Sequence, residues 1–308
     1  MSLSRATFPD GRPVSLEGEP PYAAAALEPL FEVPFLLPCE DRAVLGTGAP
    51  ANAYLEAART AWEEWPEWMD YLDPESPAYP LKRAARDLYL HWWRPWLSGR
   101  RVLDVGCGIG RFVLPLLDRG ATVWGVDGDL HSLQRCAWRA AGRPGRLDLH
   151  WSAIHRLPPV FDLDVVIACE VLCYVPDTKP VLHEIVERLR PGGALLVSLE
   201  ARYGWASSAD AAPTALSPIV GTERVVDIPG DRWVRTYDRA ELRAELEDAG
   251  LQVERLVATH YVPEGPLEQS APEDMDLAQL LEVEQACRAH PVWGPLNRVW
   301  TAVAIKPR

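Results

Sequence analysis

The stretch "RRVLDVGCGIGR", residues 100–111, decides the fold. Its first half is a branched apolar run, which predicts a strand over 101–105. Its second half carries Gly106, Gly108 and Gly110, which predict a turn whose backbone can come close to a ligand. A strand that runs into such a turn is typical of α/β sheets that bind ligands at the carboxyl ends of their strands.

The residues around these glycines limit the class of ligand. An ATP-binding loop needs GxxxxGK[ST], and no Lys-Ser or Lys-Thr pair follows here. A dinucleotide loop needs a third glycine where this chain has Arg111. Asp104, two residues before the first glycine, would repel a pyrophosphate but would accept a hydrogen bond from an ammonium or hydroxyl group. The ATP-binding loop is therefore excluded, and the residues beyond this turn must decide among the other ligands.

Strands and helices alternate from residue 100 onward, which predicts a mostly parallel sheet with helices on both faces. The predicted strands are 101–105, 121–127, 147–151, 163–169, 194–200, 251–261 and 299–307, and the helices between them are 109–118, 129–141, 175–190 and 238–249. Gly120 and Gly250 are expected as left-handed caps, and Asp238 with Glu241 as a capping box. The helix over 175–190 is expected to stop at Pro191-Gly192-Gly193.

The first third of the chain has a different character. Residues 1 to about 50 are rich in Pro and Gly, 51–69 and 81–97 are helical in composition, and 72–80 is a Pro-rich linker. We therefore expect an N-terminal arm and aromatic-rich helical lid over 1–97. An α/β core over 98–308 is expected to follow, with insertions near 201–236 and 262–296.

Charge and composition limit the classes of partner that this chain is expected to bind. The net charge of −13 disfavours a nucleic-acid partner, which usually needs a basic face. No apolar run approaches the roughly 20 residues that cross a bilayer, so neither a membrane partner nor a membrane span is expected. The six cysteines form no CxxC pair, so reduced thiols and a cytoplasmic protein are expected, as a monomer or homodimer.

Three further features complete the pattern. Asp127 ends the second strand, where a carboxylate commonly binds ribose hydroxyls. "EVLCYVPD" (170–177) follows the fourth strand, and "LRPGGALLVS" (189–198) leads into the fifth. Together with residues 100–111 they resemble the class I S-adenosylmethionine-dependent methyltransferases of the small-molecule and ubiquinone-biosynthesis type, over about residues 98–261.

The resemblance implies a fold, a cofactor and a reaction. The implied fold is an α/β, Rossmann-like, seven-stranded, mostly parallel sheet with an antiparallel last strand, here with the N-terminal helical lid in addition. The implied cofactor is S-adenosylmethionine, released as S-adenosylhomocysteine. The implied reaction is methyl transfer to O, N or C of a small molecule, and a bacterial secondary metabolite is the expected acceptor.

The resemblance also implies which residues hold the cofactor. The methionine part would lie against Asp104, Gly106, Cys107 and Gly108, the ribose against Asp127, the adenosine near Gly128, Ser152 and Ala153, and the sulfonium near Cys169 and Glu170. The family usually has an acidic residue where this chain has Ser152, whose hydroxyl is a weaker acceptor.

Residues that follow the strands are candidates for handling the acceptor. Glu170, Glu200 and His260 are the candidate general bases, because a base assists a hydroxyl or ammonium nucleophile. The predicted substrate contacts are Trp92, Tyr174, Arg202, Tyr203 and Tyr261. Trp92 belongs to a dense set of tryptophans, for which packing within a helical core is the alternative.

Other functions stay open at this point. A methyltransferase acting on tRNA or protein is the main alternative, followed by a nicotinamide oxidoreductase and a non-catalytic cofactor-binding protein. Cys107, Cys169 and Cys173 all follow strand ends and could gather around a metal, but zinc-ligand spacing is absent, so no metal is predicted.

Overall fold

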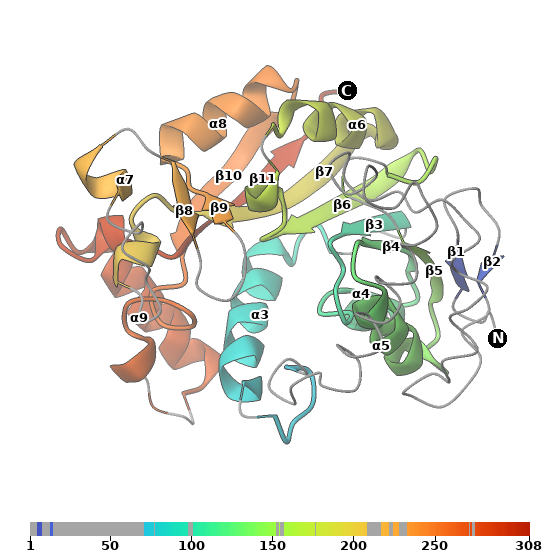
Figure 1. Ribbon diagram of the computed structural model, residues 1–308, viewed down its shortest axis with the longest axis horizontal. Helices are drawn as coiled ribbons and strands as arrows, with labels where there is room; N and C mark the ends of the chain where they lie inside the picture. The colour runs from blue at the N-terminus through green and yellow to red at the C-terminus, as the bar shows by residue number, and fades with distance from the viewer. Residues whose placement is uncertain are drawn as a thin grey trace, which may run out of the picture. The chain divides into compact units, whose positions relative to one another are not determined.

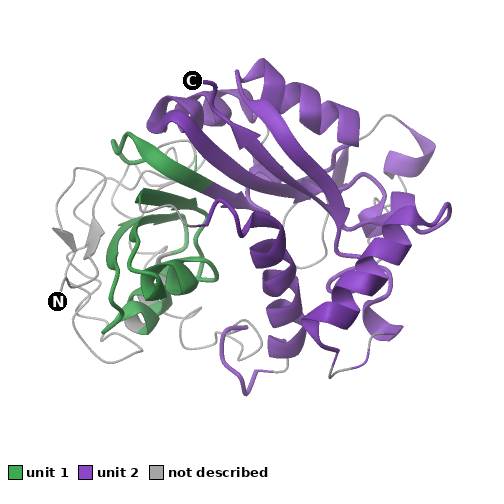
Figure 2. Cartoon of the chain, turned by 180° about the vertical axis from the view of Figure 1, so that it is seen from behind, with its two compact units in different colours: residues 1–70, 98–166 green, residues 71–97, 167–308 purple. Residues whose placement is uncertain are grey.

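The computed structural model describes residues 5–7, 13–14, 71–76, 78–97, 101–151, 154, 157–175, 177–207, 217–221, 224–227, 233–270, 272 and 275–308. The chain divides into two compact units, the first made of residues 1–70 and 98–166 and the second of residues 71–97 and 167–308 (Figure 2). The helix predicted over 51–69 lies outside the described residues. The boundary falls inside strand β6 (Leu163–Cys169), so both units contribute to that strand.

The first unit is a parallel α/β sheet (Figure 1). β3 (Arg101–Val105), β4 (Thr122–Asp127) and β5 (Arg146–Trp151) pair in parallel in that order. They are connected by α4 (Val113–Asp118) and α5 (Leu130–Ala140). Every residue of β3 after the first is buried, as expected for a strand covered on both faces. The strand predicted over 101–105 is confirmed.

Two short strands extend this sheet. β1 (Arg5–Thr7) pairs in parallel with β5, and β2 (Pro13–Val14) pairs antiparallel with β1. The sequence predicted only an irregular arm here. Strands of three and two residues are too short to show an alternating pattern, so the prediction is wrong at these positions.

In the second unit, the last strand of the chain is inserted between two others. β11 (Val299–Ile305) lies between β7 (Leu189–Glu200) and β10 (Gln252–Thr259) and is antiparallel to both. The strand order is β10-β11-β7-β6-β3-β4-β5, followed by β1 and β2. The predicted seven-stranded sheet with an antiparallel last strand is therefore confirmed.

Helices cover both faces of the strands in the second unit (Figure 1). α6 (Lys179–Arg188) and α8 (Arg239–Asp248) lie on one face. α3 (Tyr79–Trp93) and α9 (Leu277–Ala289) lie on the other. Within the described ranges, every helix is too short or too polar to span a lipid bilayer.

α3 belongs to the second unit although it lies in the segment predicted as a lid. The indole Nε1 of Trp93 donates to the carbonyl oxygen of Ala302 at 3.2 Å, which anchors the helix on β11. Pro80, predicted as the end of a linker, instead occupies the first turn of the helix, where a missing N–H has no cost.

The strand predicted over 194–200 begins earlier, because β7 already starts at Leu189 and includes Pro191-Gly192-Gly193, where the helix was expected to stop. The Gly192 N–H donates to the Lys306 carbonyl at 2.8 Å, and the Lys306 N–H donates to the Gly193 carbonyl at 2.9 Å. Pairing with the end of the chain thus overrides the local preference for a turn. The predicted caps are confirmed: Asp238 and Glu241 form a capping box, and Gly120 and Gly250 are left-handed.

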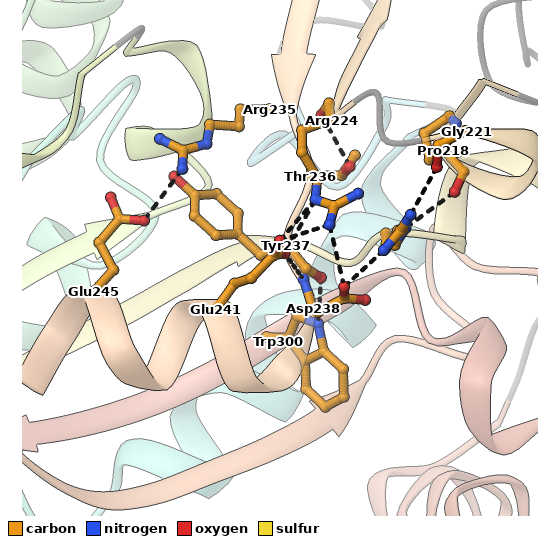
Figure 3. Close-up of polar contacts among 11 residues, drawn as sticks. Pro218, Gly221, Arg224, Arg235, Thr236, Tyr237, Asp238, Glu241, Glu245 and Trp300 are labelled. Carbon is orange, nitrogen blue, oxygen red and sulfur yellow. Dashed lines mark hydrogen bonds and ion pairs between the residues drawn. The ribbon is translucent and has the colours of Figure 1, made fainter.

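The two predicted insertions contain short elements. The first holds η5 (Gly204–Ser207), α7 (Ser217–Val220), β8 (Val225–Asp227) and β9 (Trp233–Arg235), and the second holds η7 (Glu268–Ser270), α9 and η8 (Gly294–Leu296). The first is tied to the start of α8 by the Arg224 guanidinium, which donates to Glu241 at 2.6 Å and lies 3.5 Å from Asp238 (Figure 3).

Candidate functional site

The turn after β3 has the conformation that its glycines predict. Gly106, Gly108 and Gly110 have φ values of 71°, 51° and 102°, in the left-handed region that favours glycine. The N–H groups of Gly106 and Cys107 donate to the Val126 carbonyl at 2.7 and 3.0 Å. We call residues 106–110 the glycine turn. These bonds fix it against the end of β4.

Asp127 closes the glycine turn from β4. Its carboxylate accepts the N–H of Gly108 at 2.7 Å and the N–H of Asp129 at 2.8 Å. Burial raises the pKa of Asp127 to about 6, although these amides oppose the shift. Asp127 therefore couples the turn to the loop that starts α5.

Asp104 presents a buried carboxyl group beneath the glycine turn. The residue is 2 % exposed, and its Oδ2 atom has no hydrogen-bond partner among the described residues. Burial, and then the charge of Asp127, raise the pKa of Asp104 to about 8, while Arg111 opposes the shift. A buried acceptor of this kind requires a donor. The ammonium of an amino-acid cofactor fits that requirement, so the residues present suit S-adenosylmethionine.

Within the described residues, Cys107, Cys169 and Cys173 do not form a three-ligand metal site. Cys107 lies against Cys136 of α5, and the hydrogen bond between their thiols, then burial, raises the pKa of Cys107. Cys169 and Cys173 belong to the second unit. Across the described part of the chain, no three His, Cys, Asp or Glu side chains are grouped to hold a metal ion.

Glu170 is held by both its backbone and its side chain. It follows β6 with a φ of 55°, unusual for a residue other than glycine. Its N–H donates to Ser198, to the carbonyl at 3.1 Å and to Oγ at 3.0 Å. The hydroxyl of Tyr89 donates to Glu170 Oε1 at 2.8 Å. We call Tyr89, Glu170, Ser198 and His260 the Glu170 cluster, because the ring of His260 lies 4.4 Å from that of Tyr89.

Glu200, another predicted base, lies in a buried ion pair. Its Oε2 pairs with Nη1 of Arg298 and accepts the indole N–H of Trp205 at 3.2 Å. The Arg298 guanidinium lies 3.8 Å from the centre of the Trp205 ring. Burial lowers the pKa of Arg298, and the charge of Glu170 is the largest effect in the opposite direction. This geometry indicates that Glu200 stabilises the buried Arg298 cation.

His260, the third predicted base, is fully buried with a φ of 64°. Its Nδ1 lies 3.0 Å from the Thr259 hydroxyl. Its N–H donates to Glu284 Oε2 at 2.9 Å, and the N–H groups of Tyr261 and Val262 donate to Glu284 Oε1. Glu284 thus holds the chain where β10 ends. Whether His260, Glu200 or Glu170 acts as a base stays a prediction.

The predicted substrate contacts all belong to the second unit. Tyr261 is buried, and its hydroxyl donates to the Gly294 carbonyl at 2.8 Å. Arg202 pairs with Asp238 at 2.8 Å and lies over the ring of Tyr203. Trp92 lies against the guanidinium groups of Arg255 and Arg288, and Tyr174 ends η4 (Leu172–Tyr174). Their roles in substrate binding stay predictions.

Sequence reasoning missed some residues of this site and could not test others. It read Tyr89 only as part of a helix and gave no role to Ser198 or Arg298. A tyrosine on the apolar face of a helix was the only local signal, because a buried hydroxyl needs a partner. Ser152 and Ala153, predicted to border adenine, lie outside the described residues.

Comparisons of the sequence with known proteins identify the family. A family model described as a methyltransferase domain matches residues 77–256, more than half of the chain. A ubiquinone biosynthesis O-methyltransferase from Klebsiella pneumoniae is 30% identical over 172 residues, which cover 54% of this chain and 68% of that protein. A protein of the same description from Bradyrhizobium sp. is 31% identical over 192 residues, 61% of this chain and 72% of that protein.

Solved structures agree on the fold. An S-adenosylmethionine-dependent methyltransferase from Mesorhizobium loti aligns with a TM-score of 0.54 and 21% identity, over 73% of this chain and 99% of that one. Magnesium protoporphyrin IX methyltransferase from Synechocystis PCC 6803, solved with bound S-adenosylhomocysteine, aligns with a TM-score of 0.53 and 16% identity, over 82% of this chain and 99% of that one. The chain therefore belongs to the methyltransferase-domain family and is a class I S-adenosylmethionine-dependent methyltransferase.

Proposed function

We propose that this enzyme methylates a hydroxyl oxygen of a small-molecule acceptor. The observation that carries the proposal is the Glu170 carboxylate, fixed by the hydroxyl of a buried tyrosine whose ring lies against a buried histidine ring. A carboxylate held in this way can accept a proton from a hydroxyl group as the oxygen attacks. The relatives described as O-methyltransferases of ubiquinone biosynthesis support an oxygen acceptor.

The residues of the first unit would hold the cofactor. Asp104 would accept from its ammonium group, the glycine turn would border its methionine part, and Asp127 would bind its ribose. Gly128, Ser152 and Ala153 would border the adenosine, and Cys169 and Glu170 of the second unit would lie near the sulfonium. When bound, S-adenosylmethionine supplies a methyl group on a positively charged sulfur.

The chain's own residues would then manage a single displacement. The acceptor oxygen would form the new C–O bond, the electron pair of the broken S–C bond would stay on sulfur, and the acceptor proton would pass to Glu170. Because the methyl donor is already activated, alignment and exclusion of water supply most of the catalysis. The buried Tyr89, whose hydroxyl contacts Glu170, suits both tasks.

Charge supports a small acceptor over a nucleic acid. The chain carries a net charge of −13. A protein with this net charge would repel the phosphates of tRNA. The bacterial relatives support a bacterial metabolite, methylated in the cytoplasm, as the acceptor. Residues 1–70, as part of the proposed lid, would be needed for turnover but not for cofactor binding.

One experiment tests the proposal. The purified chain is incubated with S-adenosylmethionine and, separately, with phenols, aliphatic alcohols, amines and total tRNA, and S-adenosylhomocysteine release and product mass are measured. We expect a mass increase of one methylene unit on a hydroxyl compound. Methylation of an amine or of tRNA alone would overturn the proposed acceptor, and binding of NAD with no affinity for S-adenosylhomocysteine would overturn the cofactor assignment.

A further inference from the structure

Tyr89 is a buried phenol that finds its partner in the candidate site. It lies on the inner face of α3 with Ala85, Leu88 and Trp93, and all four are fully buried. A buried hydroxyl without a partner is unfavourable, so tyrosines in such positions donate to a nearby acceptor. Tyr89 donates to Glu170 Oε1 at 2.8 Å across 81 residues of sequence. This bond is a direct side-chain link between α3 and the residue that follows β6.

The ring of Tyr89 packs against two other rings, which restrict the direction of its hydroxyl. Trp93 stacks on it at 4.9 Å with an interplanar angle of 22°. His260 lies near it at 4.4 Å with an angle of 37°. His260 is itself fixed, because its backbone N–H donates to buried Glu284. The phenol therefore approaches the Glu170 carboxylate from one direction.

The surroundings of Tyr89 keep its hydroxyl protonated, so it remains a hydrogen-bond donor. Burial, and then the negative charge of Glu170, raise the pKa of Tyr89 well above its ordinary value, so the phenol stays protonated. Cys169 and the more distant Glu264 act in the same direction, while Ser198 opposes them. A protonated phenol stabilises the ionised form of a carboxyl group that accepts its bond.

Other groups also face Glu170 from the elements around it. Ser198 of β7 donates to the Cys169 thiol at 3.3 Å, and that thiol lies 3.8 Å from Glu170 Oε1. Cys173 of η4 and the Arg298 guanidinium before β11 interact electrostatically with Glu170. Arg298 is paired with Glu200. Tyr89 differs from these groups in donating a short, direct hydrogen bond to the carboxylate.

From this geometry we infer that Tyr89 is a positioning residue for Glu170: its hydroxyl orients the carboxylate and keeps it ionised so that it can accept the acceptor's proton. The inference rests on the proposed function, since it assigns Glu170 the part of general base. It adds a residue of α3, in the N-terminal third of the chain, to the machinery of methyl transfer.

The test is Tyr89→Phe, which removes the hydroxyl and keeps the ring. Loss of the bond raises the pKa of Glu170, so the acid limb of the kcat profile is expected to move up by about one pH unit, with about tenfold lower kcat on the acid side. KM and the affinity for S-adenosylhomocysteine are expected to stay near wild type. The control is Thr236→Val, which removes the hydroxyl bond of another fully buried residue of the same unit, to the Arg224 carbonyl at 2.9 Å. It should not move the acid limb.

A second measurement works without turnover. The infrared carboxyl band that disappears in Glu170→Gln is titrated in the wild type and in Tyr89→Phe, and Glu170 should protonate at a higher pH in the variant. An unchanged titration, or the same shift in Thr236→Val, would overturn the inference. If the titration shifts but no hydroxyl compound is methylated, the positioning contact stands and the proposed acceptor is wrong.

Discussion

The glycine turn of the first unit and the Glu170 cluster of the second unit are assembled over different lengths of sequence. Gly108 and Asp127, which close the glycine turn, are 19 residues apart. Tyr89 and Glu170 are 81 residues apart, and Ser198 follows Glu170 by a further 28. The first site is encoded within one strand–helix–strand unit, whereas the second exists only when α3, β6 and β7 are packed. Residues of the second site can therefore change without altering the glycine turn.

The largest expected effect is a loss of kcat on changing Glu170, which distinguishes the Glu170 cluster from the glycine turn. Glu170→Gln keeps the shape of the side chain and an oxygen that can accept from Tyr89, but it cannot take up a proton. We expect kcat to fall by about 100-fold to 10,000-fold, the range for loss of a general base. Affinity for S-adenosylhomocysteine, measured by calorimetry, should change far less. Equal losses in both quantities would show that Glu170 belongs functionally with the cofactor-binding residues.

Glu200→Gln provides the contrast within the second unit. This change leaves the buried Arg298 guanidinium without its anionic partner. Breaking a buried pair commonly costs about 3–5 kcal/mol of folding stability. Chemical denaturation should therefore show a large loss for Glu200→Gln and a small one for Glu170→Gln. If Glu200→Gln is as stable as the wild type but inactive, Glu200 is the better candidate for the base.

The next effect tests the first unit. Asp127→Ala removes the acceptor of the Gly108 and Asp129 N–H groups as well as the proposed ribose contact. Loss of an acceptor for charged hydrogen bonds costs about 1–3 kcal/mol, so affinity for S-adenosylhomocysteine should fall by about tenfold to 100-fold. Asp118→Asn, at an exposed site of the same unit, is the control. Unchanged affinity in Asp127→Ala would remove the ribose assignment.

The difference between local and long-range contacts also explains which residues could be predicted from the sequence. The turn glycines, Asp104 and Asp127 stand next to strands with a clear apolar pattern, so their places in the fold were predictable. Arg298 carries no local signal and Tyr89 only its place on the apolar face of a helix, because their partners come from distant segments. The β7 extension was missed for the same reason, since residues near the end of the chain hold Pro191–Gly193 in the sheet.

Two glycines, one within β4 and one just after it, allow packing and ligand binding to be compared inside the first unit. A Cβ at Gly125 would lie 2.7 Å from Leu149 Cδ2 and 2.9 Å from Cys107 Sγ, whereas a Cβ at Gly128 would meet nothing within 4 Å. Gly125→Ala should therefore destabilise the fold by about 1–3 kcal/mol, as overpacked cores do. Gly128→Ala should leave stability within about 0.5 kcal/mol of wild type. A weaker affinity for S-adenosylhomocysteine in Gly128→Ala alone would locate adenosine there, and wild-type affinity would exclude that contact.

The smallest expected effect is a pH dependence of cofactor affinity, which should come from Asp104 of the first unit. The pKa of Asp104 is raised to about 8 in the ligand-free protein, so the group is protonated at neutral pH. The stability that it contributes is present below its ordinary pKa of 3.8 and is lost as pH rises through about 8, and Asp127 behaves likewise through about 6. A cofactor ammonium favours the carboxylate, so binding should release a proton below pH 8. Affinity for S-adenosylhomocysteine should then rise with pH, by at most about tenfold per unit.

Calorimetry in buffers of different ionisation enthalpy measures that proton directly. Asp104→Asn should abolish most of the release, and Glu170→Gln should leave it in place, because Glu170 belongs to the other region. Proton release that persists in Asp104→Asn would mean that the ammonium meets a different group. If proton release disappears in Glu170→Gln, the protonation of Asp104 depends on Glu170. The glycine turn and the Glu170 cluster would then differ in the length of sequence that encodes them but would share their proton chemistry.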